Sequence, residues 1–381
     1  MKYILSPSTS SNMSISPGTL DPNPNGNPTN TLFVGTFFHD IHCAFAEAIG
    51  ADVFSLFGPK YEEWDSVAES TQARLRHYVR KAREIPSGYD NYLLEGGTSL
   101  IPAALFTLRN RNANTILLNA DETFINVIDG VEHYGKMDAY VHQLCSRSLD
   151  GLVNVGDFAG MYARRANLDV QSVTVYPGIK DELYRRLGTI PVSVGSKNIV
   201  VVGYGKNHAR RTGGSSTGFD LLVEAMPDIR DVHPESELHI AGKGHPKAWE
   251  KHAGVVLHGW VADLAEFFSH GEVSAHPGRS ESFSVAALEP MRAARPCIVS
   301  NMVGAKDVVE EVSETLVCEP TVAGVRETLI DYFDRSEEKR REMCEQARVT
   351  VEGFDESSVV TDFVNEYTKL CEQLSETAKA K

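Results

Sequence analysis

Short apolar runs alternate along this chain with longer stretches whose apolar residues recur at helical spacing. The runs include NYLLEG, TILLNA, KNIVVVGYG and ELHIAGKG, and each ends in small or polar residues. Continuous apolar runs of this length are typical of strands buried on both faces of a parallel sheet. Strands that alternate with helices predict an α/β protein, here with six or so such units in each half. We therefore expect two doubly wound, Rossmann-like domains facing each other across a cleft.

The N-terminal region departs from this regular alternation. Residues 2–5 (KYIL) look like a first strand, and the Ser, Pro, Asn and Gly that crowd residues 6–30 indicate a long loop. A loop of this length within a domain is either a functional lid or a disordered segment. We interpret residues 31–50 as a helical segment that Gly50 ends, with a strand after it in ADVFSLFG.

Residues 74–83 (RLRHYVRKAR) form a strongly basic helical patch with Leu75 and either Tyr78 or Val79 on one side. Two interpretations stay open for it. The patch docks on an anionic membrane surface, or it is a solvated helix face, which is the more common role of such charge runs.

Composition limits the class of protein. The length of 381 residues suits about two domains, and a net charge of −15 argues against a nucleic-acid partner. The six cysteines are scattered without a CxxC pair, so neither a zinc site nor a disulfide framework is expected. No run approaches the ~20 apolar residues of a membrane span, and the first residues do not resemble a signal peptide. We expect a cytoplasmic protein, with peripheral membrane contact through residues 74–83 left open.

The candidate chemistry is concentrated in residues 276–300, HPGRSESFSVAALEPMRAARPCIVS. Glu281 follows a loop of small residues, and Glu289 lies on an apolar run suited to a helix. Eight helical steps separate the two carboxylates by roughly 12 Å, beyond the roughly 5 to 9.5 Å of a glycosidase pair. Between them, Ser282, Phe283 and Ser284 would offer free backbone N–H groups at a helix N-terminus, where phosphate binds readily. A carboxylate beside a phosphate site suggests recognition of sugar or ribose hydroxyls.

This stretch resembles the signature of the retaining glycosyltransferases of family 4 (group 1), which have the GT-B fold. The family pattern reads P-S-x-x-E-x-F-G, then E-A-x-A-x-G-x-P-V-I. Six residues match it, namely Pro277, Glu281, Phe283, Glu289, Ala293 and Pro296. Four depart from it, namely Gly278, Ser284, Pro290 and Ala294. Since proline within a helix costs about 3 kcal/mol or a kink, we expect the helix to start late or bend at Pro290.

The resemblance implies roles for the residues that match. It assigns Glu281 to the donor sugar, the amides around Phe283 and Ser284 to the diphosphate, and Glu289 to the ribose. It also places Gly242 in a glycine turn near the nucleotide, and Gly259 and Val261 near the base. Arg279, directly before Ser280 and Glu281, could reach a phosphate.

The loop after KNIVVVGYG does not carry a dinucleotide fingerprint, because His208 stands where the third glycine belongs. It resembles instead the family segment G-R-x-x-x-x-K-G-x-D, in which Arg and Lys neutralise the diphosphate. Here Thr217 replaces the lysine. We expect Lys206, after Gly205, to take the arginine's place. Arg210 or Arg211 would take the lysine's place, unless these cations are only solvated loop charges.

Polar residues also follow two strands of the first half, where ligands of open α/β sheets bind. They are Glu95, Gly96, Gly97, Asn119, Asp121 and Glu122. The family often has a sugar-contacting histidine near here. Asp121 or Glu122 stands in its place, and Asp121 is our candidate for that role. The alternative is that these residues cap the next helices. The cluster of His39, Asp40 and His42 is interpreted as a helix start and not as a metal site.

These observations predict an acceptor-side domain over residues 1–185, a linker near 185–197, and a nucleotide-sugar domain over 196–356. The resemblance implies that a final helix over 357–381 packs back on the first domain. The resemblance implies a metal-independent transferase without a cofactor, using a nucleotide sugar and a carbohydrate or lipid-linked acceptor. A protein that only binds the nucleotide sugar, and a GT-B phosphorylase or epimerase, stay open as alternatives. Sugar, base, acceptor and oligomeric state are left undetermined.

Overall fold

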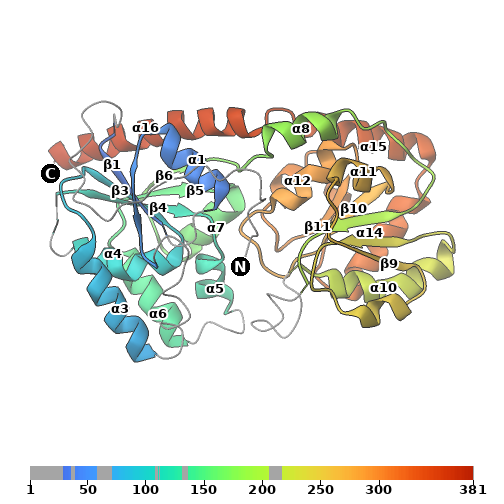
Figure 1. Cartoon of the computed structure of the whole chain (residues 1–381), viewed down its shortest axis with the longest axis horizontal. Coiled ribbons are helices and arrows are strands. Elements are labelled where there is room, and N and C mark those ends of the chain that lie inside the picture. Colours follow the sequence, from blue (N-terminus) through green and yellow to red (C-terminus); the bar gives the residue numbers. More distant parts are fainter. Residues whose placement is uncertain are drawn as a thin grey trace.

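The computed structural model describes residues 29–35, 39–57, 71–107, 110, 112–130, 136–205 and 217–380. These residues form two α/β domains that lie side by side (Figure 1). Each domain is built on a six-stranded sheet whose paired strands are all parallel, with helices packed on the sheet. The expected two-domain α/β architecture is confirmed.

The first sheet has the strand order β2-β1-β3-β4-β5-β6. Its strands are β1 (Thr31–Gly35), β2 (Asp52–Ser55), β3 (Asn91–Glu95), β4 (Asn114–Asn119), β5 (Gly151–Asn154) and β6 (Gln171–Thr174). The helices of this domain are α1 (Asp40–Ala48), α3 (Thr71–Glu84), α4 (Leu100–Thr107), α5 (Thr123–Asp129), α6 (Lys136–Ser146) and α7 (Asp157–Arg165), with a 3₁₀ turn over Gly97–Ser99. β1 and β3 are buried at every position, which explains their continuous apolar sequences.

The sequence interpretation of residues 31–50 as one helical segment is wrong in its first part. Thr31–Gly35 is strand β1, paired on one side with β2 and on the other with β3. Only Asp40–Ala48 is helical. A short apolar run such as TLFV suits a buried strand and a buried helix equally, so periodicity alone does not separate them. The predicted strand over residues 2–5 and almost all of the loop over 6–30 lie outside the described residues.

The second sheet has the order β12-β11-β10-β7-β8-β9. Its strands are β7 (Ile199–Val202), β8 (Leu238–Ala241), β9 (Val255–Gly259), β10 (Val273–His276), β11 (Cys297–Ser300) and β12 (Val317–Cys318). The helices after β6 are α8 (Asp181–Gly188), α10 (Phe219–Val232), α11 (Leu264–Ser269), α12 (Val285–Arg292), α13 (Lys306–Val309), α14 (Val322–Asp334), α15 (Glu337–Thr350) and α16 (Glu356–Ala380), with 3₁₀ turns over Lys247–Lys251 and Glu314–Leu316.

Helix α16 lies along the first domain, where it contacts α1, β5 and β6 (Figure 1). The rings of Phe363 in α16 and Phe45 in α1 stack with their centroids 4.2 Å apart. The hydroxyl of Tyr367 lies 3.0 Å from Oγ1 of Thr31, at the start of β1. The end of the chain is therefore part of the first domain's core.

The connection between the domains is fixed to the second domain. Residues 185–188 of the expected linker are helical, as the end of α8, so the irregular segment begins at Thr189. Farther along, the amides of Gly195 and Lys197 donate to Oε2 of Glu272, at 2.6 and 3.1 Å. Glu272 is fully buried.

Candidate functional site

The loop after β10 holds Glu281 in a defined position. The backbone N–H of Glu281 donates to the carbonyl of Met302, and its carbonyl accepts from the N–H of Gly304, both at 3.0 Å. The loop therefore runs beside the segment that follows β11. The side-chain atom Oε2 accepts a hydrogen bond from Nε2 of His276, the last residue of β10, at 2.5 Å. The His276 side chain is 6% exposed and that of Glu281 31% exposed, so the carboxylate is the accessible end of the pair.

The residues after Glu281 join the two domains. Oγ of Ser282 donates to the carbonyl of Ala120, which follows β4 of the first domain, at 2.8 Å. The ring of Phe283 is buried and meets the ring of Tyr176 edge-on, with 5.7 Å between the centroids. The structure thus places the predicted phosphate-binding stretch directly against the end of the first sheet.

Helix α12 starts immediately after this contact. No side chain caps its N-terminus, where Ser284 occupies the N-cap position. The first amides of an α-helix have no partner within the helix, and the helix dipole favours negative charge at this end. An anion is therefore the natural partner of this helix start. The helix begins at Val285, runs through Pro290 and ends at Arg292. Of the two expected outcomes, a late start is not observed, and a bend at Pro290 stays a prediction.

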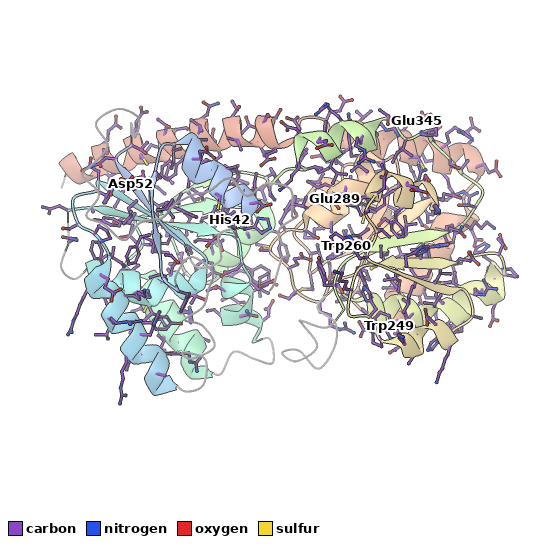
Figure 2. The ribbon with its side chains drawn as sticks, viewed as in Figure 1. His42, Asp52, Trp249, Trp260, Glu289 and Glu345 are labelled. Atoms are coloured by element: carbon purple, nitrogen blue, oxygen red, sulfur yellow. The ribbon has the colours of Figure 1, made fainter. Side chains whose placement is uncertain are left out.

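Glu289 lies within α12, as the sequence predicted (Figure 2). Its surface is partly open to solvent. Burial raises the pKa of Glu289 to about 7. A carboxyl group with this pKa changes charge near neutral pH, so it can either donate or accept a hydrogen bond with a ligand hydroxyl.

The glycines at the ends of β7 and β8 allow two loops to touch. A Cβ on Gly242, whose φ is +131°, would lie 1.7 Å from the carbonyl oxygen of Gly203. The amide of Gly205 donates to the carbonyl of Lys243 at 3.0 Å. Side chains at these glycines would force the loops apart. The close packing of the two loops therefore explains why glycine stands at the turns that the sequence singled out.

Beyond β9, Val261 is half-buried, and the preceding Trp260 is 58% exposed. Nζ of Lys243 lies 5.2 Å from the centroid of the Trp260 ring (Figure 2 labels Trp260). Sequence reasoning missed Trp260, although a tryptophan between the predicted base-contacting residues Gly259 and Val261 was a usable signal.

Arg279 is paired within the protein. Its Nη1 and Nη2 donate to Oδ1 and Oδ2 of Asp220 at 2.9 and 2.7 Å, a bidentate ion pair. Asp220 lies in the first turn of α10. The phosphate contact of Arg279 remains a prediction, and in this conformation the guanidinium joins the loop after β10 to α10.

The predicted cations of the loop after β7 cannot be placed. Lys206, Arg210 and Arg211 lie outside the described residues, which resume at Thr217.

At the end of the first sheet, the carboxylate of Asp121 accepts hydrogen bonds from two backbone amides. Its Oδ2 accepts from the N–H of Gly97 at 2.7 Å, and its Oδ1 accepts from the N–H of Thr123, the first residue of α5, at 3.0 Å. The side-chain amide of Asn119 donates to Oδ1 of Asn154 and to the carbonyl of Ala159. The capping alternative therefore describes Asp121, whereas the Asn119 side chain donates to β5 and α7. The sugar-binding role of Asp121 remains a prediction.

A histidine and a glutamate that the sequence did not connect meet at the same end of this sheet. Nδ1 of His42, in α1, lies 2.8 Å from Oε1 of Glu95, the last residue of β3. The same oxygen accepts from the backbone N–H of His39 at 3.4 Å. Burial, with the neighbouring His42, lowers the pKa of His39 to about 4. Within the described ranges, no group of three His, Cys, Asp or Glu side chains is arranged to hold a metal ion.

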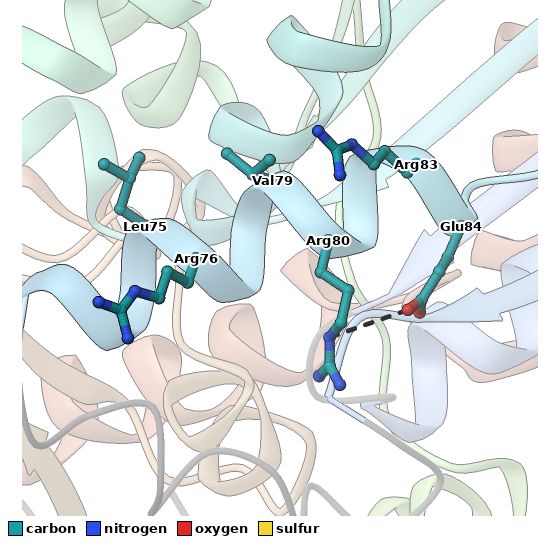
Figure 3. A pocket seen from close by; sticks show the side chains of 6 residues that line it. All are labelled: Leu75, Arg76, Val79, Arg80, Arg83 and Glu84. Atoms are coloured by element: carbon teal, nitrogen blue, oxygen red, sulfur yellow. Dashed lines mark ion pairs between the residues drawn. The ribbon is translucent and has the colours of Figure 1, made fainter.

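A second surface feature lies on α3, away from these loops. A groove of about 530 Å³ is lined by Leu75, Arg76, Val79, Arg80, Arg83 and Glu84 (Figure 3). Leu75 is 58% exposed. None of the helices in the described part of the chain is long and apolar enough to span a bilayer.

Comparison with known proteins agrees with this arrangement. Residues 198–334 match the family model described as glycosyl transferases group 1. Among curated proteins, the chain is similar to glycogen synthase from Mycobacterium tuberculosis, with 27% identity over 156 residues. That match covers 38% of this chain, and the chain spans only 37% of the length of that relative.

Solved structures extend the similarity to both domains. Sucrose-phosphate synthase from Thermosynechococcus elongatus has 16% identity and a TM-score of 0.65, covering 89% of this chain and 98% of that chain. Anabaena HepE in complex with UDP-glucose has 15% identity and a TM-score of 0.62, covering 89% and 99%. The chain therefore has the GT-B fold that the sequence predicted.

Proposed function

We propose that this protein is a glycosyltransferase that moves a sugar from a nucleoside-diphosphate donor to a hydroxyl group. One observation carries the proposal. The part of the chain that matches the group 1 model contains a partly exposed Glu281, held by His276, beside the uncapped start of α12. Free amides at a helix start suit a diphosphate, and an accessible carboxylate next to them suits sugar hydroxyls.

The roles follow from this arrangement. Glu281 orients the donor sugar, and the amides of Ser282, Phe283 and Ser284 bind the diphosphate. Glu289, farther along α12, binds the ribose hydroxyls. The leaving diphosphate gains charge in the transition state, and nearby cations stabilise such charge by several kcal/mol. Lys206 with Arg210 or Arg211 supplies them in this proposal, which requires no metal and retains the configuration of the sugar.

UDP-glucose is the first donor to test, because HepE was solved with UDP-glucose. The acceptor is a carbohydrate or lipid-linked hydroxyl. The fold similarity to TarM, solved with α-GlcNAc-glycerol and UDP, supports a carbohydrate-type acceptor.

The test combines UDP binding by calorimetry with UDP release from UDP-glucose, using the full chain. Glu281→Gln should lower turnover by about 100-fold or more and leave UDP affinity unchanged, since the change affects the sugar and not the nucleotide. Glu289→Gln should weaken UDP binding. Glu327→Gln, whose side chain is 70% exposed on α14, is the matched control. Full transfer by Glu281→Gln would contradict the proposal.

Two further measurements test the finer points. Turnover that persists in EDTA supports metal independence, and NMR of the product sugar shows whether its configuration is retained. Donor binding without transfer or hydrolysis would favour the binding-only alternative, which Thr217 in place of the motif lysine keeps open. Donor isomerisation, or release of a sugar phosphate, would favour an epimerase or a phosphorylase.

We also propose that α3 contacts an anionic membrane surface. Its exposed face combines Leu75 with Arg76, Arg80 and Arg83, in a chain of net charge −15. Apolar contact together with basic charge is what binds helices to anionic lipid. Reversing the three arginines to glutamate should abolish sedimentation with phosphatidylglycerol vesicles. Lys247→Glu with Lys251→Glu, on exposed positions of the second domain, should not. Equal binding to neutral phosphatidylcholine vesicles would contradict this proposal.

A further inference from the structure

The imidazole of His276 connects Glu281 to the interior of the second domain. His276 ends β10, which lies between β11 and β7 within the sheet. Its side chain is 6% exposed, and its Nε2 lies 2.5 Å from Oε2 of Glu281. An ionised carboxylate only accepts hydrogen bonds, so Nε2 carries the proton of this hydrogen bond. The carboxylate is thus tied to a buried ring at the end of an inner strand.

Aromatic packing in turn fixes the ring of His276. The ring of Phe219, the first residue of α10, meets it edge-on at 90°, with 6.1 Å between the centroids. Phe219 is fully buried and stacks on the ring of His245, with the centroids 5.8 Å apart. Nε2 of His245 lies 2.9 Å from the carbonyl oxygen of Gly203, which follows β7. A continuous line of contacts therefore runs from the end of β7 to Glu281.

This hydrogen bond leaves one oxygen of the Glu281 carboxylate for a ligand. His276 engages Oε2, and Oε1 accepts no hydrogen bond within the described residues. The side chain of Glu281 is 31% exposed. A long side chain with this exposure would sample several rotamers if nothing held it. Fixing it in advance removes that loss of entropy from the binding and transfer of a ligand.

We infer that His276 is a positioning residue, which orients Glu281 so that Oε1 accepts a hydrogen bond from a hydroxyl of the donor sugar. This inference rests on the proposed function. The imidazole keeps its proton throughout and takes part in no bond-making or bond-breaking step. A carboxylate that moves by about 1 Å can lower the rate by as much as about 100-fold. Loss of His276 should therefore affect the sugar and leave the nucleotide unaffected.

Two substitutions of similar length separate the hydrogen bond from the packing. His276→Gln keeps an N–H donor, whereas His276→Met has none. In UDP release from UDP-glucose, His276→Met should lower kcat by about 10- to 100-fold, and His276→Gln should retain most of the rate. UDP affinity by calorimetry should stay unchanged in both variants, because UDP lacks the sugar. Equal rates in the two variants, or a loss of UDP affinity, would overturn the inference.

The matched control is His233→Met. The side chain of His233 is also buried, at 8% exposure, and its Nε2 lies 3.2 Å from Oδ1 of Asp334. His233 follows the last residue of α10, whereas the contact of His276 is with the first. Loss of a buried histidine–carboxylate pair at this end should leave kcat unchanged. A loss of kcat equal to that of His276→Met would mean that any such pair in the domain matters, which would overturn the inference.

A double-mutant cycle tests whether His276 acts through Glu281. In the Glu281→Ala background, His276→Met should cause little further loss of kcat, because the carboxylate that the ring positions is absent. The same loss in both backgrounds would overturn the inference. A chain that neither binds UDP nor releases it from UDP-glucose would instead overturn the proposed function.

NMR of ¹⁵N-labelled histidine tests the hydrogen bond without turnover and without a variant of His276. The unaltered protein should show a slowly exchanging proton on Nε2 of His276. In Glu281→Ala this proton should exchange rapidly with water, because its acceptor is absent. A His276 ring without a proton on Nε2, or a proton whose exchange does not depend on Glu281, would overturn the inference.

Discussion

The backbone N–H of Phe158 in the first domain donates a hydrogen bond to Oδ2 of Asp307 in the second domain, at 2.9 Å. Phe158 lies in the first turn of α7, where amides have no partner within the helix. Asp307 therefore serves as a cap for a helix of the opposite domain. Nζ of Lys306 lies 5.7 Å from the centroid of the Phe158 ring and adds to the same contact.

Asp307→Ala should loosen the contact between the domains. Losing a carboxylate at a helix N-terminus costs about 1 kcal/mol of unfolding free energy. We expect that loss in urea unfolding, together with a larger radius of gyration by small-angle X-ray scattering. Asp331→Ala is the control, because the side chain of Asp331, which pairs with Arg335, is 62% exposed. An Asp307 variant as compact and stable as the control would show that this contact does not hold the two domains together.

The linker should depend on one buried carboxylate. Glu272 accepts hydrogen bonds from the linker amides of Gly195 and Lys197 and forms an ion pair with Nε of Arg340 at 3.2 Å. Both charged side chains are almost completely buried. Glu272→Ala leaves Arg340 unpaired, and the unfolding free energy should fall by about 3 to 5 kcal/mol.

Urea denaturation measures this loss. Glu327→Ala serves as the control, since its exposed pair with Arg326 should contribute less than about 1 kcal/mol. A Glu272 variant that lost no more than this control would mean that the linker is held by other contacts, such as those of Arg295 with backbone carbonyls.

The fold was predictable from the sequence where strands are buried on both faces. NYLLE and LHIA are apolar because helices cover both sides of their sheets, and their lengths fit strands better than helices. Thr31–Gly35 was missed because only Gly35 and Thr36 separate TLFV from the apolar residues of FFHDIHCAF, so the whole stretch was interpreted as one segment.

The sequence predicted site residues only where they lie close together along the chain. Glu281, Ser282 and Glu289 follow one another along a single loop and helix, so a motif records them. The pairs His42 with Glu95 and Asp220 with Arg279 join residues 53 and 59 positions apart. Such pairs depend on which strands are neighbours in the sheet and on how helices pack, which one sequence does not reveal.

Glu289 should make stability depend on pH. Its pKa is raised by burial from 4.5 to about 7, so the folded protein binds the proton more tightly than the unfolded chain. The stabilisation is complete below about pH 4.5 and is lost as the pH rises to about 7. Glu289→Gln should flatten that part of the stability profile, and Glu224→Gln, at an exposed position of α10, should not. If the unfolding free energy of both variants changed equally with pH, a group other than Glu289 would cause the dependence.

The Asp220–Arg279 pair can be tested by a double-mutant cycle. The two side chains form two parallel hydrogen bonds and are 24% and 33% exposed, so each fixes the other in a partly desolvated place. Asp220→Ala and Arg279→Ala should each lower the unfolding free energy. The double variant should lose less than the sum, with a coupling of about 0.5 to 3 kcal/mol. If the arginine acts on a phosphate only through the loop that its pair with Asp220 positions, Arg279→Ala should weaken UDP binding when Asp220 is present and add little loss in the Asp220→Ala background. A larger loss of UDP affinity in the Asp220→Ala background would mean that the released guanidinium binds the phosphate directly, and calorimetry on the four proteins decides between the two.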